Sequence, residues 1–300
     1  MIAEAKVWIR AMRPEQWVKN IVVFAAYIFA RADPSQVHAA GVAATVEILL
    51  AGFLFCLVSS SVYLFNDARD ADADRSHPVK KRRPIAAGEM SVSAAYVLSA
   101  VLATFAFAVA AFFMPLRFCA IVGLYVLVQL LYTLLLKKVP YVDVFVISTG
   151  FVLRAVAGAV ALDVRISPWL LLCTFLLSLF LALCKRRHEK LLLSDDDAAN
   201  HRESLHGYDC RALDAQIAVT AASTVVCYAI YTLSAETAAR FGTGYLGLTL
   251  PFVVFGVFRY LALVYRHEGG GRPEKIMLTD RVMLFTLVCY AAATAAILFC

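Results

Sequence analysis

The apolar residues of this chain gather into blocks about as long as a lipid bilayer is thick. Nine such blocks lie at about 17–31, 45–65, 91–113, 118–136, 141–162, 168–184, 216–234, 244–264 and 282–300. A transmembrane helix needs about 20 mostly apolar residues, and the blocks lack the alternation of polar and apolar residues that barrel strands show. Because backbone groups inside a bilayer must bond one another, we expect an all-α, polytopic membrane protein with nine transmembrane helices.

The composition of the 300-residue chain agrees with this expectation. Hydrophobic residues make up 62% and charged residues 17%, and the mean hydropathy is +0.75. Soluble domains contain about 45–50% apolar residues, so the excess must face lipid. We therefore expect one integral membrane domain over residues 1–300. The first apolar block is short, so residues 17–20 would enter the membrane or line a cavity.

Residues 1–14 predict a short helix that lies on the membrane surface. Ala5, Trp8, Ile9 and Met12 fall on one helical face, and Pro14 would end the helix. Residues 1–20 hold basic residues throughout and lack the apolar core of a cleavable signal.

Lysine and arginine are divided unevenly among the loops. With a cytoplasmic N-terminus, 22 of the 28 lie on the cytoplasmic side and four outside. Cytoplasmic loops carry an excess of these residues, so we expect a multi-pass protein of the inner (plasma) membrane, with the N-terminus and the active-site loops in the cytoplasm. The net charge of +6 does not indicate nucleic-acid binding, because the basic residues are split among loops between spans.

The loop at 66–90 carries a spaced acidic cluster. On a helix that continues from the second block, Asn66, Asp67, Asp70 and Asp74 share one arc of about 100°, whereas Asp72 points away. Like charges at this spacing repel, and Mg²⁺, which binds one or two carboxylates together with substrate phosphates, would offset the repulsion. We expect a magnesium site there, with Asp67, Asp70 and Asp74 catalytic. The alternative is a solvated acidic loop neutralised by its own Arg69 and Arg75.

A basic run follows the acidic cluster. Residues 80–84 read KKRRP, and four cations beside a metal site suit a ligand with several phosphate groups. The alternative is attraction to anionic lipid. We expect Lys80 and Arg83 to bind phosphate.

The loop at 185–215 is the longest. It opens with KRRHE, so that Lys185 and Arg186 stand at the exit of the sixth block as further phosphate contacts, and Tyr208 is a third expected substrate contact. The acidic triplet 195–197 follows Ser194, which indicates a helix N-cap with an acidic first turn and not a metal site.

Two of the cations inside apolar blocks are candidate site residues. Arg154 shares one face of the fifth block with Asp143, Gly150 and Gly158. A charge in a membrane is costly, so Arg154 faces either a wet cavity, which we expect, or buried partners inside the protein. Lys19 at the start of the first block poses the same choice.

These segments together resemble a known family. The spacing N-D-x-x-D-x-x-x-D at 66–74, in a chain with nine expected spans, is similar to the first motif of the UbiA superfamily of intramembrane prenyltransferases. The segments RPEQWVKN (13–20), 66–88, FVLRAVAG (151–158) and KRRHE (185–189) further resemble its decaprenyl-phosphate phosphoribosyltransferase branch, which joins 5-phosphoribosyl diphosphate to a polyprenyl phosphate for cell-wall arabinan. One departure is that KRRHE stands where many aromatic prenyltransferases of the superfamily carry a second acidic motif.

The resemblance implies a UbiA-like bundle around a central cavity open to the cytoplasm. It implies that Mg²⁺ and diphosphate bind at Asn66, Asp67, Asp70 and Asp74, and that Lys19 and Arg154 contribute inside the cavity. The expected partners are phosphoribosyl diphosphate, a polyprenyl phosphate lipid and the membrane. Two alternatives stay open: a polyprenyl diphosphate:aromatic acid prenyltransferase of quinone synthesis, and a non-enzymatic lipid-phosphate transporter. Small residues such as Ala155 and Ala159 would allow close contacts in a homo-oligomer.

Overall fold

The computed structural model describes residues 2–76, 79–192, 205, 207–266, 276 and 279–299. Its elements are α1 (Ile2–Ala11), η1 (Pro14–Phe24), α2 (Ala25–Arg31), η2 (Pro34–Ala40), α3 (Val42–Arg69), α4 (Ala71–Ser76), η3 (Lys80–Arg82), α5 (Val92–Phe113), α6 (Leu116–Leu134), η4 (Leu136–Lys138), α7 (Val142–Ala161), α8 (Pro168–Leu192), α10 (Cys210–Leu233), α11 (Ala235–Phe241), η6 (Tyr245–Thr249), α12 (Leu250–Arg266) and α14 (Arg281–Phe299). The described residues contain no strand, so the all-α prediction is confirmed.

Eight helices among the described residues are long and apolar enough to cross a membrane: α3, α5, α6, α7, α8, α10, η6 with α12, and α14. They coincide with eight of the nine predicted blocks. The remaining block, 17–31, forms η1 followed directly by α2, so a ninth span stays a prediction. The break before η1 has a local cause, because Pro14 opens it and Arg13 ahead of it takes a left-handed backbone conformation with φ 54°. The helix predicted within residues 1–14 is α1.

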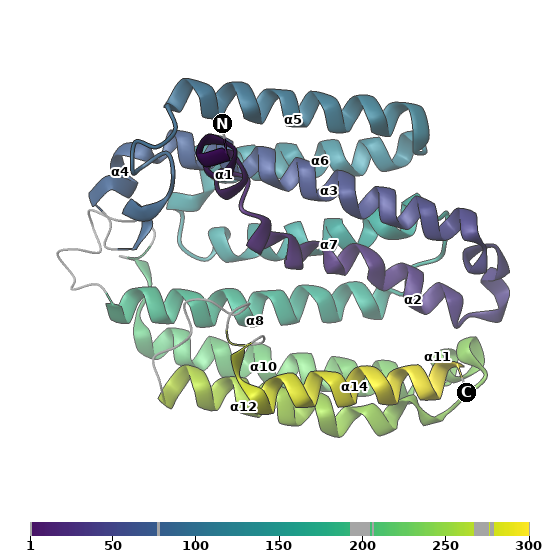
Figure 1. Ribbon diagram of the computed structural model, residues 1–300. Helices are drawn as coiled ribbons and strands as arrows, with labels where there is room; N and C mark the ends of the chain where they lie inside the picture. The colour runs from purple at the N-terminus through teal and green to yellow at the C-terminus, as the bar shows by residue number, and fades with distance from the viewer. Residues whose placement is uncertain are drawn as a thin grey trace.

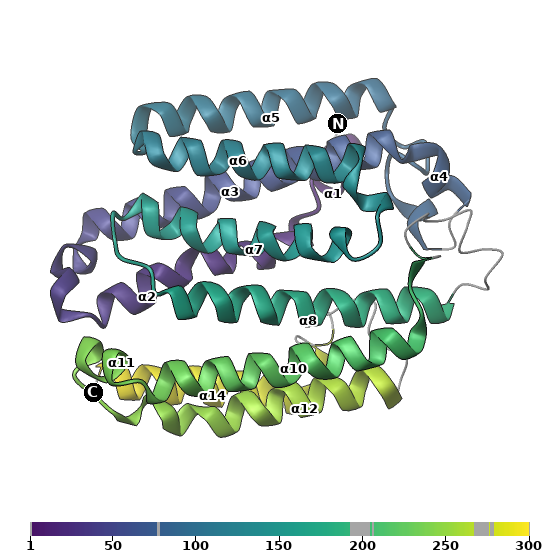
Figure 2. The ribbon, with the colours of Figure 1, turned by 180° about the vertical axis from the view of Figure 1, so that it is seen from behind.

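The helices run side by side in two groups (Figures 1 and 2). The first group contains α1 to α7, with α3 packed against α5, α6, α7 and η1. The second contains α10, α12 and α14, and α8 joins the two groups because it packs on both α7 and α10. Each group has its own apolar core, which includes Phe55 and Phe118 in the first and Phe180 and Leu213 in the second.

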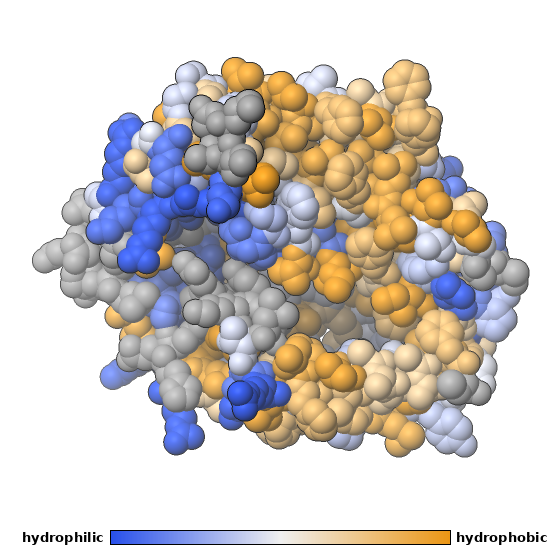
Figure 3. Space-filling model, viewed as in Figure 1, coloured by the Kyte–Doolittle hydropathy of each residue, from blue (hydrophilic) through white to orange (hydrophobic). Residues whose placement is uncertain are grey.

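Large apolar side chains also cover the outside of the bundle. Phe112 on α5 is 85% exposed and Phe285 on α14 is 69% exposed. Figure 3 shows one face of the molecule, with a broad hydrophobic surface and hydrophilic residues gathered toward its left and right ends. Such a surface is stable in lipid and not in water, which agrees with a multi-pass membrane protein. Ala155 and Ala159 are buried within the chain, 0% and 2% exposed. They pack inside the chain and do not contact another copy, and a homo-oligomer stays a prediction.

The two ends of the bundle receive different loops. The ends of α3, α6, α8 and α12, from which the predicted cytoplasmic loops leave, lie at one end, next to α4 (Figure 1). The other end holds η2 and α11, which contact each other. We call these the α4 end and the α11 end. All charged residues of the predicted magnesium and phosphate site belong to the α4 end.

Candidate active site

A polar cavity of about 360 Å³ lies at the α4 end. Its lining comes from the region before η1 and from α3, α4, η3, α6, η4 and α8. The lining residues are Arg13, Val62, Tyr63, Asn66, Asp70, Ala73, Asp74, Lys80, Arg83, Gln129, Tyr132, Thr133, Lys137, Lys138, Lys185 and Glu189. Six of these side chains are cationic and three are acidic, so the cavity suits an anionic ligand that also presents groups for carboxylates.

The predicted acidic arc forms one wall. α3 ends at Arg69, and α4 continues almost at once, with the Asp74 amide donating to the Asp70 carbonyl at 2.8 Å. Because the helical repeat is nearly preserved across this junction, Asn66, Asp70 and Asp74 face the same cavity. Asp72, predicted to point away, has a side chain that is 94% exposed.

Asp67 does not line the cavity; it is 3% exposed and accepts hydrogen bonds from two arginines. Arg13 Nη2 lies 2.6 Å from its carboxylate, and Arg83 Nη1 lies 3.1 Å away. Arg83 also contacts Asp74 at 2.5 Å, so one guanidinium bridges two of the predicted metal ligands. Asp67 therefore does not face the cavity but holds Arg13 and Arg83, which do.

Protein cations offset the repulsion that the acidic cluster creates. Asp70 pairs with Lys137 of η4, in addition to the two arginine contacts above. These ion pairs offset part of the repulsion within the chain, and the expected magnesium site beside them stays a prediction. Of the two arginines in the alternative, Arg75 pairs with Asp72, which lies outside the arc of Asn66, Asp70 and Asp74. Among the described residues, no three Asp, Glu, His or Cys side chains converge into a metal cluster.

Burial affects the charge of Asp74, which is 3% exposed. Desolvation raises the pKa of its carboxyl above the ordinary value, against the opposing attraction of Arg83 and Lys80. The carboxylate form of Asp74 therefore depends on the cations that face it.

A second wall comes from the end of α8. Lys185 and Glu189 both line the cavity, since residues four apart lie on one helical face. Arg186, between them, turns inward and is 1% exposed. Its Nε lies 2.7 Å from Asp143 Oδ2 of α7, and it also donates to Glu189.

Tyr208 belongs to the same buried network and does not line the cavity. Its hydroxyl donates to Asp143 and accepts from the Tyr141 amide at 2.8 Å. Gly207 beside it packs so closely on Pro140 that an added Cβ would lie 2.3 Å from the proline ring. Arg186 and Tyr208 thus tie the chain on either side of the 193–204 segment to α7, and the structure does not bring these two predicted substrate contacts to the cavity. The predicted acidic triplet 195–197 and Ser194 lie outside the described residues.

Arg154 is also buried, 4% exposed, and is absent from the cavity lining. It donates to Asn20 Oδ1, the Gly150 carbonyl and Tyr125 Oη at 2.8–2.9 Å, and its guanidinium lies over the Tyr125 ring. Gly158 on the same face lets η1 approach, since an added Cβ would lie 1.9 Å from the Val23 carbonyl oxygen. These contacts favour the alternative of buried partners, and a contact between Arg154 and substrate stays a prediction.

Lys19 is half-buried on η1 and is not among the cavity residues, so its contact with substrate stays a prediction. Sequence reasoning missed Arg13, Gln129, Tyr132, Lys137 and Glu189 as cavity residues. The one signal available was that each is a polar residue near the predicted cytoplasmic end of a block or, for Gln129, inside the block, which many other residues share.

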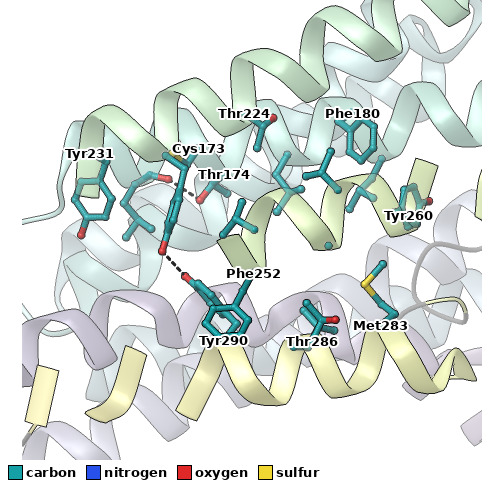
Figure 4. Close-up of a pocket in the computed structure, with 18 of the residues that line it drawn as sticks. Cys173, Thr174, Phe180, Thr224, Tyr231, Phe252, Tyr260, Met283, Thr286 and Tyr290 are labelled. Carbon is teal, nitrogen blue, oxygen red and sulfur yellow. Dashed lines mark hydrogen bonds between the residues drawn. The ribbon is translucent and has the colours of Figure 1, made fainter. Parts of the chain in front are cut away.

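A second cavity, of about 300 Å³, lies among α8, α10, α12 and α14 (Figure 4). Its lining is aromatic and aliphatic, with a few hydroxyls; Tyr228 donates to Tyr290 at 3.2 Å. α8 contributes to both cavities, because Leu181 lines the apolar one and Lys185, one turn further, lines the polar one.

Known proteins match most of the chain. The model of the UbiA prenyltransferase family matches residues 21–286. The chain is 36% identical to the decaprenyl-phosphate phosphoribosyltransferase of Mycolicibacterium smegmatis, over 97% of this chain and 92% of that protein. It is 35% identical to the enzymes of the same name from Corynebacterium glutamicum, over 92% and 81%, and Mycobacterium tuberculosis, over 97% and 94%.

The fold also matches solved structures. A UbiA homolog from Archaeoglobus fulgidus, solved with DMAPP and Mg²⁺, superposes with a TM-score of 0.70 over 97% of both chains at 17% identity. A homolog from Aeropyrum pernix has a TM-score of 0.68 over 94% of this chain and 98% of that one, at 16% identity. At such low identity these two structures bear on the fold alone.

Proposed function

This chain belongs to the UbiA prenyltransferase family, and we propose that it transfers 5-phosphoribose from phosphoribosyl diphosphate to a polyprenyl phosphate, such as decaprenyl phosphate, with release of diphosphate. Three relatives with 35–36% identity carry the name of this enzyme. The observation in the molecule that supports the assignment most is the polar cavity, in which six cations and three carboxylates face one space. The donor and acceptor together carry diphosphate, a 5-phosphate and a lipid phosphate, which accounts for so many cations. The product would supply cell-wall arabinan synthesis.

Mg²⁺ is the cofactor that we propose, held by Asn66, Asp70 and Asp74. These side chains bring oxygen atoms to one wall, and Mg²⁺ takes only one or two carboxylates when substrate phosphates supply its other ligands. The residues thus fit the ion even though no three acids converge. When bound, Mg²⁺ would offset the negative charge that develops on the departing diphosphate. Asp67, buried behind this wall, would orient Arg13 and Arg83, which line the cavity.

The remaining cations would bind and orient phosphate groups. Lys80 and Arg83 face the acidic wall, and Lys137, Lys138 and Lys185 come from η4 and α8. Phosphates bound among them would place the anomeric carbon beside the acceptor oxygen. Holding two reactants in this way supplies a large part of a rate enhancement.

The reaction exchanges one bond for another at the anomeric carbon. The bond to the diphosphate oxygen breaks, and an oxygen of the lipid phosphate forms the new bond to an oxocarbenium-like centre. The second pKa of a phosphate monoester is about 6, so the acceptor is already largely dianionic at pH 7. It needs no strong base, in keeping with a lining that, among the described residues, holds Asp, Glu, Lys and Arg without His.

The polyprenyl tail would lie in the apolar cavity. Leu181 and Lys185 are one turn apart on α8 and line the apolar and the polar cavity, so a lipid could place its head in one and its tail in the other. The polar cavity would open to the cytoplasm, where phosphoribosyl diphosphate is soluble, and the protein would reside in the plasma membrane.

The alternative aromatic prenyltransferase would bind a prenyl diphosphate as donor. Lys185 stands in the segment where that branch carries acidic residues, and this favours the phosphoribosyl reaction. A transporter without chemistry has no comparable support, since the named relatives are transferases.

The experiment incubates the purified protein with phosphoribosyl diphosphate labelled in the ribose, decaprenyl phosphate and Mg²⁺. We expect label in the lipid fraction that depends on Mg²⁺. A parallel reaction with decaprenyl diphosphate and an aromatic acid tests the alternative. Absence of label in lipid from an active, folded preparation would overturn the proposal.

A further inference from the structure

Glu189 is an unexpected residue among phosphate-binding cations. The other two acids of the polar cavity, Asp70 and Asp74, stand on α3 and α4 with Asn66, whereas Glu189 comes from α8. A carboxylate repels phosphate, so Glu189 lowers the affinity of the cavity for a ligand made only of phosphates. Because Glu189 lines the cavity, its carboxylate suits a ligand group that a carboxylate attracts.

A buried network fixes the direction of the Glu189 carboxylate. Arg186 Nη1 donates to Glu189 Oε2, while Arg186 Nε lies 2.7 Å from Asp143. Arg186 and Asp143 are 1% and 0% exposed, and the Tyr208 hydroxyl also donates to Asp143. Glu189 itself stays 23% exposed. Because buried residues hold Arg186 in place, the Glu189 carboxylate keeps one orientation. Recognition of a hydrogen-bonding ligand group requires such a fixed orientation.

Two kinds of ligand group bind a carboxylate in such a cavity: hydroxyl donors and metal ions. Phosphoribosyl diphosphate carries two adjacent hydroxyls on its ribose, and a prenyl diphosphate carries none. A carboxylate accepts hydrogen bonds through both oxygens, and bonds to a charged acceptor are about twice as strong as neutral ones. Gln129 and Tyr132 on the α6 wall add neutral polar groups of the kind that contact sugars.

We propose that Glu189 recognises the ribose hydroxyls of the donor and thereby selects a phosphosugar diphosphate over a prenyl diphosphate. The inference rests on the phosphoribosyl function proposed above and assigns within it the residue that reads the sugar. Glu189 is thus a specificity-determining residue of the second wall, and Arg186 is the residue that positions it.

The test removes the proposed hydrogen bond between Glu189 and the ribose, first by changing the donor and then by changing the protein. The wild-type protein and Glu189→Gln are assayed with phosphoribosyl diphosphate and with its 2-deoxy and 3-deoxy analogues. In the wild type, loss of a recognised hydroxyl should raise the donor KM about tenfold to a hundredfold. Glu189→Gln should raise the KM for the natural donor by a similar factor, discriminate little between natural and deoxy donors, and leave the KM for decaprenyl phosphate unchanged.

A matched control is Glu89→Gln, the same chemical change at an acid that pairs with Arg10 on the surface and does not line the cavity. It should match the wild type in every assay. If Glu189→Gln does not fold, Glu189→Asp and the deoxy donors with the wild type still decide the question.

Three results would overturn the inference. One is a donor KM that Glu189→Gln leaves unchanged. Another is a rise in the Mg²⁺ concentration needed for half-maximal rate, which would make Glu189 a metal ligand. The last is equal use of natural and deoxy donors by the wild type. If the wild type transfers ribose, these failures concern Glu189 alone; if it transfers none, the proposed function fails first.

Discussion

The two ends of the bundle hold similar charged side chains in opposite arrangements. At the α11 end, Asp33 accepts hydrogen bonds from Ser35, Gln36 and Arg240, with Arg240 Nε at 2.7 Å. Arg240 and Gln36 also bond the backbone of Arg165. At the α4 end the charges surround a cavity of about 360 Å³. At the α11 end the charged side chains pair with one another and connect the two helix groups. At the α4 end the charged side chains surround an open cavity.

The same contrast exists within the α4 end. Arg186 and Lys185 are neighbours on α8, yet Arg186 is enclosed by Asp143 and Glu189 while Lys185 faces the cavity. A charged side chain in a membrane protein therefore indicates a binding site only when its partners are also known. Enclosed charges should matter for stability and cavity charges for turnover.

The largest effect is expected at Arg186. Arg186→Met leaves Asp143 buried without its cation, and breaking a buried pair from one side costs about 3–5 kcal/mol. The free energy of unfolding in detergent, measured with denaturant, should fall by that amount. If Arg186→Met is as stable as the wild type and has lost only donor binding, then enclosed charges do not act mainly on stability, and the contrast with the cavity charges fails.

Asp70 should show the opposite behaviour. Its side chain is 27% exposed and lines the cavity, so Asp70→Asn should lower kcat/KM by about 100-fold or more, equivalent to roughly 2.7 kcal/mol, with little change in stability. Asp72→Asn is the matched control, because that side chain is 94% exposed and should retain full activity. Equal activity of the two variants would contradict the placement of the acidic wall.

Asp33 tests the α11 end through pH. Burial acts to raise its pKa, but hydrogen bonds from Ser35, Gln36 and Arg240 outweigh that effect and lower the pKa to about 2 from 3.8. A depressed pKa adds stability above the unfolded value that disappears as the pH falls through the folded value. The stability difference between wild type and Asp33→Asn should therefore be about 2 kcal/mol near pH 7 and shrink between pH 4 and 2. A difference that does not change with pH would mean that the ion pair is not its source.

The smallest effect is expected at an exposed pair. Arg75 and Asp72 lie 2.5 Å apart but are 54% and 94% exposed, and such pairs contribute less than about 1 kcal/mol. Arg75→Ala should leave activity unchanged and alter the unfolding free energy by no more than that. A large loss of turnover in Arg75→Ala would mean that residues outside the cavity also take part in catalysis.

The fold was largely predictable because lipid imposes a strict requirement. A run of about 20 apolar residues has few alternatives in a membrane protein, and eight predicted blocks became helices. The block at 17–31 was harder to predict, since Arg13 and Pro14 begin a 3-10 helix there. Local spacing also placed Asn66, Asp70 and Asp74 on one wall, because α4 nearly continues α3.

The rest of the candidate site depends on contacts between distant segments. Arg13 reaches Asp67 across 54 residues, and Lys137 reaches Asp70 across 67. Neither spacing has a local signature. Arg154, inside a block, and Arg186, at the exit of a block, were interpreted as ligand contacts. In sequence, a cation at either place looks the same whether it faces a cavity or a buried partner such as Asp143.

The pairing of the acidic wall has a consequence for the order of events at the cavity. Arg83 and Lys137 act as resident counterions for Asp74 and Asp70, so a bare divalent ion would have to compete with them for the same oxygens. A phosphorylated ligand changes this competition, since it gives both cations a new anionic partner as they leave the carboxylates. On the proposed function, magnesium and diphosphate would therefore bind together, because either one alone would displace these counterions poorly.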